Sequence, residues 1–164
     1  TFAKTVYALW QIPKEKLFIR PKKNLAPAAY LLSHLVNFER WVNYYAFGQD
    51  EPEAVLPMNP TKYELTEYLH NKPSKEVLVK KWLFVRSKTT SLLQKVDDEF
   101  LKEYQHDRDT CEPRRERYVQ LMVRQNFVFG KIDSILQYYR EKSVETPSRE
   151  DATQWLENWK KENL

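Results

Sequence analysis

Glycine is scarce in this chain, which has 2 glycines among 164 residues. A doubly wound nucleotide-binding fold needs several glycines in its phosphate loop, and neither GxGxxG nor GxxxxGK occurs. An all-β sandwich is also disfavoured, because its tight turns usually require glycine. Because 41% of the residues are hydrophobic and 30% are charged, the composition also disfavours a disordered chain. A mostly helical, all-α protein remains.

Cysteine and long apolar runs are equally rare. Cys111 stands alone, which excludes an internal disulfide and a CxxC zinc site and favours a reducing compartment, the cytoplasm or an organelle matrix. Its neighbours Asp109 and Glu112 are acidic, which disfavours a nucleophilic role for the thiol. The absence of an 18-residue apolar run predicts that no segment spans a membrane.

Apolar residues instead recur at helical spacing in four long segments. Residues 26–47 show this most clearly, because Leu31, Leu35, Phe38 and Val42 step by 4, 3 and 4. The same spacing predicts helices over residues 1–12, 74–96 and 113–142, a short helix over 60–71 and a polar connection over 97–113. We expect an up-and-down four-helix bundle over residues 1–142. A linker and an amphipathic helix would occupy residues 143–164, started by a capping box of Ser148 and Asp151.

Short motifs in the first half occur in the order that a known family shows. They are a P-x-x-x-L step, an Arg-Pro, a His-Leu and an acidic-Arg-Trp, here Pro13–Leu17, Arg20–Pro21, His34–Leu35 and Glu39–Trp41. With the helices that follow, this order resembles the DinB/YfiT-like superfamily over residues 5–142. The resemblance implies a helical bundle that binds a metal ion through three histidines, one on the second helix and an HxxxH pair on the fourth.

The resemblance also implies that the metal ligands are incomplete. His34 stands at the first ligand position, and aligning Gly130 with the family glycine puts Arg124 and Val128 at the other two. Valine has no donor atom and arginine stays protonated, so we expect no metal and no cofactor. His34 and Arg124 are candidates for binding a small anion. Glu39 is a possible partner of Arg124, and a solvated position of Arg124 at the rim of the bundle is the alternative of equal weight. Gly130 itself predicts the close approach of another helix, because a mid-helix glycine costs about 1 kcal/mol relative to alanine.

Basic residues gather near the N-terminus. Residues 1–23 carry six cations and one acid, a net +5 against +4 for the whole chain. A nucleic-acid contact through this stretch is one interpretation; a solvated linker is the other, and it is favoured. The cations that such a contact would use are Lys14, Lys16, Arg20, Lys22 and Lys23.

The last helix carries an aromatic face. Trp155, Leu156 and Trp159 gather on one side of it, and exposed aromatic residues are favoured in protein interfaces. These three residues are therefore candidates for binding a partner. The alternative is that the helix covers the open side of the bundle, and the two interpretations are compatible.

The preferred hypothesis is a metal-free, DinB-like bundle that acts by binding, as a scaffold or as a subunit of a larger assembly. Its partner would be another protein or a second copy of the chain. The alternative is a DinB-family enzyme, a thiol-dependent transferase or a hydrolase, with a rearranged site. No catalytic residue is predicted in either case.

Overall fold

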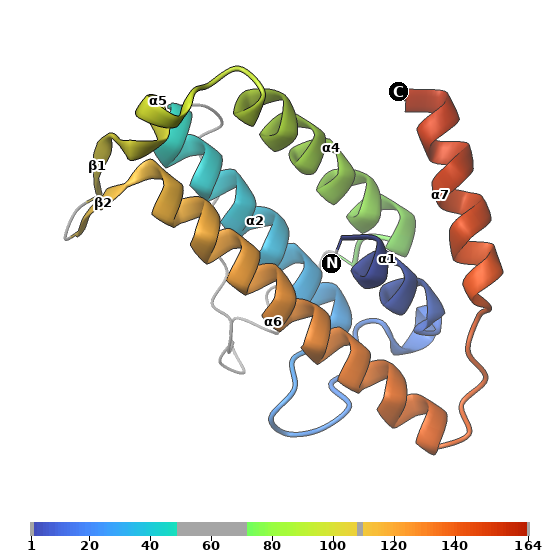
Figure 1. Ribbon diagram of the computed structural model, residues 1–164. Helices are drawn as coiled ribbons and strands as arrows, with labels where there is room; N and C mark the ends of the chain where they lie inside the picture. The colour runs from blue at the N-terminus through green and yellow to red at the C-terminus, as the bar shows by residue number, and fades with distance from the viewer. Residues whose placement is uncertain (1, 49–71, 108–109, 164) are drawn as a thin grey trace.

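The computed structural model describes residues 2–48, 72–107 and 110–163, so the short helix expected over 60–71 lies outside the described part. Helices make up most of what is described (Figure 1). The elements in chain order are α1 (Phe2–Gln11), a 3-10 turn (Lys14–Lys16), α2 (Ala28–Phe47), α4 (Lys75–Leu93), α5 (Asp98–Lys102), β1 (Tyr104–Asp107), β2 (Thr110–Pro113), α6 (Arg114–Glu141) and α7 (Arg149–Asn163).

Local capping residues fix where several helices begin and end. Ser74 Oγ accepts a hydrogen bond from the Val77 amide at the start of α4. Gly48 ends α2 with a φ of 66°, the left-handed conformation that glycine adopts without strain. Ser148 and Asp151 each accept a hydrogen bond from the other's amide, at 3.2 and 3.3 Å. The predicted capping box is therefore confirmed.

The core of the bundle lies between α1, α2, α4 and α6. Most of the apolar residues that recur at helical spacing in the three long predicted helices are buried there, whereas Tyr45, Leu92 and Val96 are only partly buried. The buried ones are Leu31, Leu35, Phe38 and Val42 from α2, Leu78, Trp82 and Val85 from α4, and Leu121, Val128, Ile132, Ile135 and Tyr139 from α6. The helical spacing of apolar residues thus identified the faces that pack together.

The direction of one helix differs from the predicted up-and-down arrangement, in which α4 would run antiparallel to α2. Glu39 of α2 contacts Trp82 and Arg86 of α4, and Asn43 contacts Thr89 further along both helices. The two helices therefore run parallel, as Figure 1 also shows. The connection over residues 48–74 is long enough for this, because about ten extended residues cover the roughly 30 Å length of a 20-residue helix.

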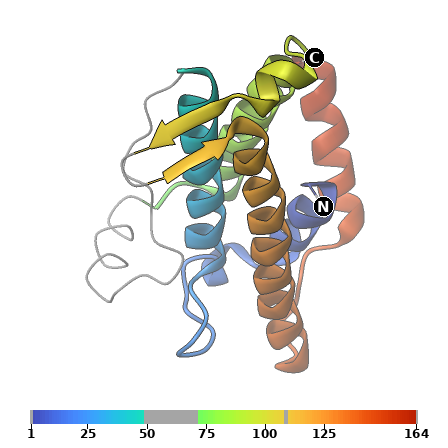
Figure 2. The same cartoon turned by 60° about the vertical axis from the view of Figure 1, so that its left-hand side comes forward.

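A hairpin stands where only a polar connection was expected. β1 and β2 pair antiparallel, with Tyr104 opposite Pro113 and His106 opposite Cys111. Figure 2 shows this hairpin at the end of the bundle where α6 begins. The segment contains no Asn-Gly or Asp-Gly pair, which is the sequence signal of a tight hairpin. The sequence therefore did not predict these two strands.

The helix α7 packs on the bundle through α1, and the two lie side by side in Figure 1. The rings of Trp155 and Trp10 are 4.6 Å apart, and Leu156 is 3% exposed within the core. Two of the three residues proposed to bind a partner, Trp155 and Leu156, therefore pack on the chain's own helices, while the Trp159 side chain lies outside the described part. The helix covers one side of the bundle, as the alternative interpretation held.

Lys75 ties the end of α1 to the start of α4. Its Nζ donates hydrogen bonds to the carbonyl oxygens of Trp10 and Ile12, each at 2.6 Å. A cation at this place also suits the negative end of the helix dipole of α1. Because the side chain is buried, the pKa of Lys75 falls from 10.5 to about 8.

Gly130 does not have the role predicted for it. It lies exposed on α6, and a Cβ atom built there would have nothing within 4 Å. No neighbouring helix comes close to it in the part of the chain that the structure describes. The glycine is therefore not explained by packing within the bundle.

Across residues 2–48, 72–107 and 110–163, no helix is both long enough and apolar enough to cross a bilayer.

Candidate functional site

The two candidate anion-binding residues meet at one aromatic ring. His34 of α2 is 3% exposed, and its ring lies 6.3 Å from that of Phe38 at an angle of 19°. Arg124 reaches the same Phe38 from α6, with its Cζ 4.7 Å from the ring centroid. The structure therefore places His34 and Arg124 around Phe38, at the seam between α2 and α6.

The three residues that the resemblance puts at the ligand positions do not fit a three-histidine metal centre. Only His34 has a donor atom for a metal, since Val128 is a fully buried hydrocarbon side chain and Arg124 brings a positive charge. Among the residues that the structure describes, no three His, Cys, Asp or Glu side chains cluster closely enough to hold an ion. His70 lies outside the described residues, and His106 belongs to β1.

Arginine–aromatic contacts occupy this seam. Arg117 lies 4.9 Å from the Trp41 ring, one helical turn along α2 from the contact between Arg124 and Phe38. The Phe38 and Trp41 rings are themselves 5.4 Å apart. Each cation over an aromatic face contributes roughly 0.5–2 kcal/mol. The seam is thus built for packing between helices, with two guanidinium groups against aromatic faces.

Glu39 has a different partner from the one expected. It is completely buried, and Arg86 of α4 lies 3.0 Å from its carboxylate. Thr89 Oγ1 at 2.7 Å and Trp82 Nε1 at 3.2 Å also donate to it. Glu39 was suggested as a possible partner of Arg124, but the partners that its carboxylate has come from α4, and Arg124 lies over the Phe38 ring instead.

This buried cluster is structural. Burial raises the pKa of Glu39, and the nearby Arg86 guanidinium and the donated hydrogen bonds partly oppose that rise. Asn43 extends the cluster by donating from its Nδ2 to Thr89 Oγ1 at 2.9 Å. A carboxylate enclosed by donors cannot reach a substrate. Glu39 therefore fixes the register of α2 against α4.

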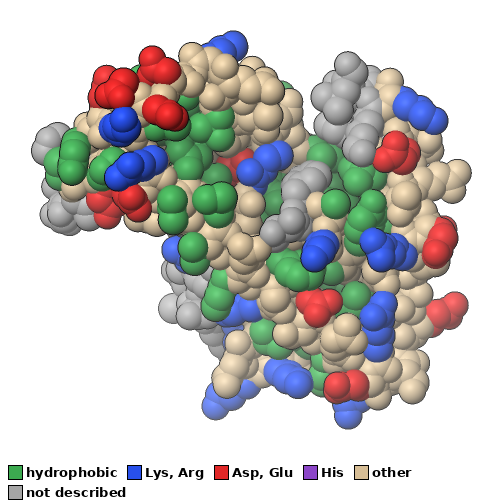
Figure 3. Space-filling view, viewed as in Figure 1, with side chains coloured by type: hydrophobic (Ala, Val, Ile, Leu, Met, Phe, Trp, Pro, Cys, Tyr) green, Lys and Arg blue, Asp and Glu red, His purple; other side chains and the backbone are tan. Residues whose placement is uncertain are grey.

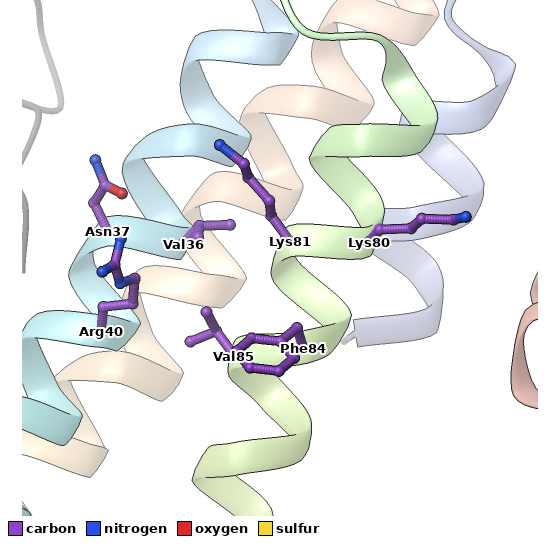
Figure 4. Close-up of a pocket in the computed structure, with 7 residues that line it drawn as sticks. All are labelled: Val36, Asn37, Arg40, Lys80, Lys81, Phe84 and Val85. Atoms are coloured by element: carbon purple, nitrogen blue, oxygen red, sulfur yellow. The ribbon is translucent and has the colours of Figure 1, made fainter. Parts of the chain in front are cut away.

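A hollow of about 480 Å³ opens on the outer side of the same two helices (Figure 4). Asn37 and Arg40 of α2 and Lys81 of α4 supply polar groups along it. Val36, Val85 and the ring of Phe84 supply apolar surface. Sequence reasoning missed this site, because Arg40 and Lys81 are far apart in the chain and meet only when α2 and α4 run parallel.

The N-terminal basic stretch is partly engaged by the chain itself. Lys14 lies 3.5 Å from Glu76 of α4, and the Lys22 ammonium lies 5.1 Å from the Tyr138 ring of α6. These contacts connect the stretch to two helices of the bundle. The nucleic-acid interpretation stays an untested prediction.

The outer side of α6 carries a second row of apolar residues that sequence reasoning did not single out. We name it the α6 stripe: Val119, Met122, Val123 and Phe127, which are between 43 and 64% exposed. Figure 3 shows hydrophobic side chains reaching the surface on the face that carries α6. Their spacing of three and four residues is typical of one helix face and could have been noticed in the sequence. The buried row of apolar residues on the other side of α6 has the same spacing, and only that row was considered.

Comparison with known proteins supports the family resemblance. A family model described as the DinB superfamily matches residues 1–127. The searches of curated proteins and of solved structures found no match.

Proposed function

Since the chain belongs to the DinB superfamily and has its all-α fold, we propose that it acts as a binding or scaffold protein, as a subunit of a larger assembly. The observation that carries this proposal is the chemistry at the family's metal positions. A histidine, an arginine against Phe38 and a buried valine stand there. These three side chains cannot supply the ligands that a metal-dependent member of the family would need.

The α6 stripe supports the choice of a protein as the partner. Val119, Val123 and Phe127 are four residues apart, so they form one ridge along the helix. Contiguous exposed apolar surface of this kind marks interaction sites in otherwise water-soluble domains. Glu116 and Lys131, near the two ends of the ridge, give it a polar border. The partner would be another protein or a second copy of the chain.

Sedimentation velocity of the native complex tests this interface. Val123→Glu places a charge in the middle of the α6 stripe and is expected to lower the mass of the assembly. Gln137→Glu is the matched control, since it adds the same charge to an exposed position of α6 beyond the stripe. An assembly whose mass is the same with both variants would show that the stripe is not the interface.

A further inference from the structure

The outer face of α6 lacks the charged residues that a surface helix usually carries. The exposed residues of α6 between Arg115 and Asp133 are Val119, Gln120, Met122, Val123, Asn126, Phe127 and Gly130, and none of these seven is charged. Charged residues make up 30% of the whole chain, so about two of seven exposed positions would ordinarily hold one. Such depletion of charge is typical of the centre of a protein interface.

Two of the charged residues of α6 are turned towards the bundle instead. Arg117 is 4% exposed and lies against Trp41, and Arg124 lies against Phe38. The helix thus places two guanidinium groups in the seam with α2 while the α6 stripe stays on its outer side. Exposed hydrocarbon of this extent is favourable to cover, by roughly 25 cal/mol for each Å² removed from water.

The α6 stripe is arranged symmetrically about its middle residue. Val119 lies four residues before Val123 and Phe127 lies four residues after it. A two-fold axis near Val123 therefore brings Val119 of one copy against Phe127 of the other, so that a small side chain meets a large one at both ends. Because the exposed residues in between are uncharged, two such faces do not repel each other. The face is complementary to itself in an antiparallel pair.

The charges that border this face also match in an antiparallel pair. Arg115 and Asp133 are 18 residues apart, which is about five turns, so both project from the same flank of α6. Antiparallel pairing about Val123 places Arg115 of one copy near Asp133 of the other. Arg115 lies 3.6 Å from Glu116 within its own chain, and its side chain is still 58% exposed. A parallel pair would instead place Arg115 against Arg115, which is unfavourable.

We propose that the α6 stripe binds a second copy of the chain, with the two α6 helices antiparallel about a two-fold axis near Val123. This inference rests on the proposed function, because it names the partner of the same surface. The symmetry makes each contact between Val119 and Phe127, and each ion pair between Arg115 and Asp133, occur twice.

Sedimentation velocity of the purified full chain over a range of concentrations tests the proposal. We expect a reversible equilibrium between monomer and dimer with no other protein present. Val123→Glu places two like charges at the two-fold axis and is expected to weaken dimerisation about tenfold. Gln154→Glu is the matched control, because it adds the same charge to an exposed position of α7 and should leave dimerisation unchanged. Circular dichroism establishes that each variant is folded.

A charge exchange tests the antiparallel geometry. Arg115→Glu and Asp133→Arg each bring like charges together, and each is expected to weaken dimerisation about fivefold. The two substitutions combined in one chain restore opposite charges across the axis, so the double variant should return to within about twofold of the parent. The two positions are about 27 Å apart along one helix, so this rescue cannot arise within a single chain.

The outcomes separate this inference from the proposed function. A purified chain that stays monomeric at every concentration, or a dimer that Val123→Glu leaves intact, would overturn the pairing of two copies. The proposed function would still hold if Val123→Glu lowered the mass of the native complex, because the partner would then be a different protein. If Val123→Glu changed neither the purified chain nor the native complex, both would fail. Absence of rescue in the double variant would overturn the antiparallel pairing.

Discussion

Lys75 offers the sharpest test of how α1 packs against α4. Lys75→Met keeps the length of the side chain but leaves the carbonyl oxygens of Trp10 and Ile12 without their donor. A hydrogen bond from a charged group contributes about 1.5–3 kcal/mol. The variant also removes a buried charge, which acts in the opposite direction. At pH 7 we expect a net decrease of about 1–3 kcal/mol in the free energy of unfolding.

The effect of Lys75→Met depends on pH with a definite sign. The pKa of Lys75 is about 8 in the folded protein against 10.5 unperturbed. Between these values the unfolded chain binds more protons than the folded one, so this group makes the parent protein more stable as pH rises. From pH 7 to 9.5 the linkage relation gives about 2 kcal/mol. The variant cannot titrate at this position, so the gap in stability between parent and variant should widen by that amount.

Urea unfolding followed by circular dichroism at pH 7 and pH 9.5 measures this gap. Lys80→Met is the matched control, because Lys80 lies exposed on the same helix; its small effect should be equal at both pH values. A gap between parent and Lys75→Met that stays constant or narrows with rising pH would refute the description of Lys75 as a buried, desolvated ammonium.

The remaining predictions concern the core, the family metal positions and α7. Leu35→Ala and Leu121→Ala should each lower the free energy of unfolding by about 2–5 kcal/mol; unchanged denaturation midpoints would argue against the central packing. Arg124→His combined with Val128→His should create measurable zinc or nickel affinity by calorimetry, and no gain would mean that the register of α6 is wrong. Truncation after Lys142 should leave a folded chain by circular dichroism that is less stable by at least about 2 kcal/mol, since it uncovers α1; equal stability would contradict that packing.

The buried face of each long helix could be predicted from the sequence because it depends on local periodicity. Leu35 and Leu121 lie in rows with helical spacing, and a bundle buries such rows whatever the order of its helices. Helix ends were equally accessible, because Ser148, Asp151 and Gly48 act on backbone groups within a few residues.

The features that depend on which helices become neighbours could not be predicted. Glu39 and Arg86 are far apart in the chain, and their pairing follows from the parallel course of α2 and α4. The same course brings Arg40 beside Lys81. A sequence pattern indicates which side of each helix is buried. It does not indicate which neighbouring helix supplies the partner of a charged residue. This is why Glu39, suggested as a possible partner of Arg124, pairs with Arg86 instead.

The seam between α2 and α6 is held by side-chain packing among the residues that the structure describes. A three-histidine site ties two helices through coordination bonds, and losing two ligands would leave His34 buried beside a gap. Here Val128 fills its position with hydrocarbon, and the Arg124 guanidinium lies against Phe38. Arg117 against Trp41 repeats the contact further along the seam. Planar, weakly hydrated guanidinium groups suit such half-buried aromatic surfaces. These contacts hold the two helices together, and none of them requires a bound ion.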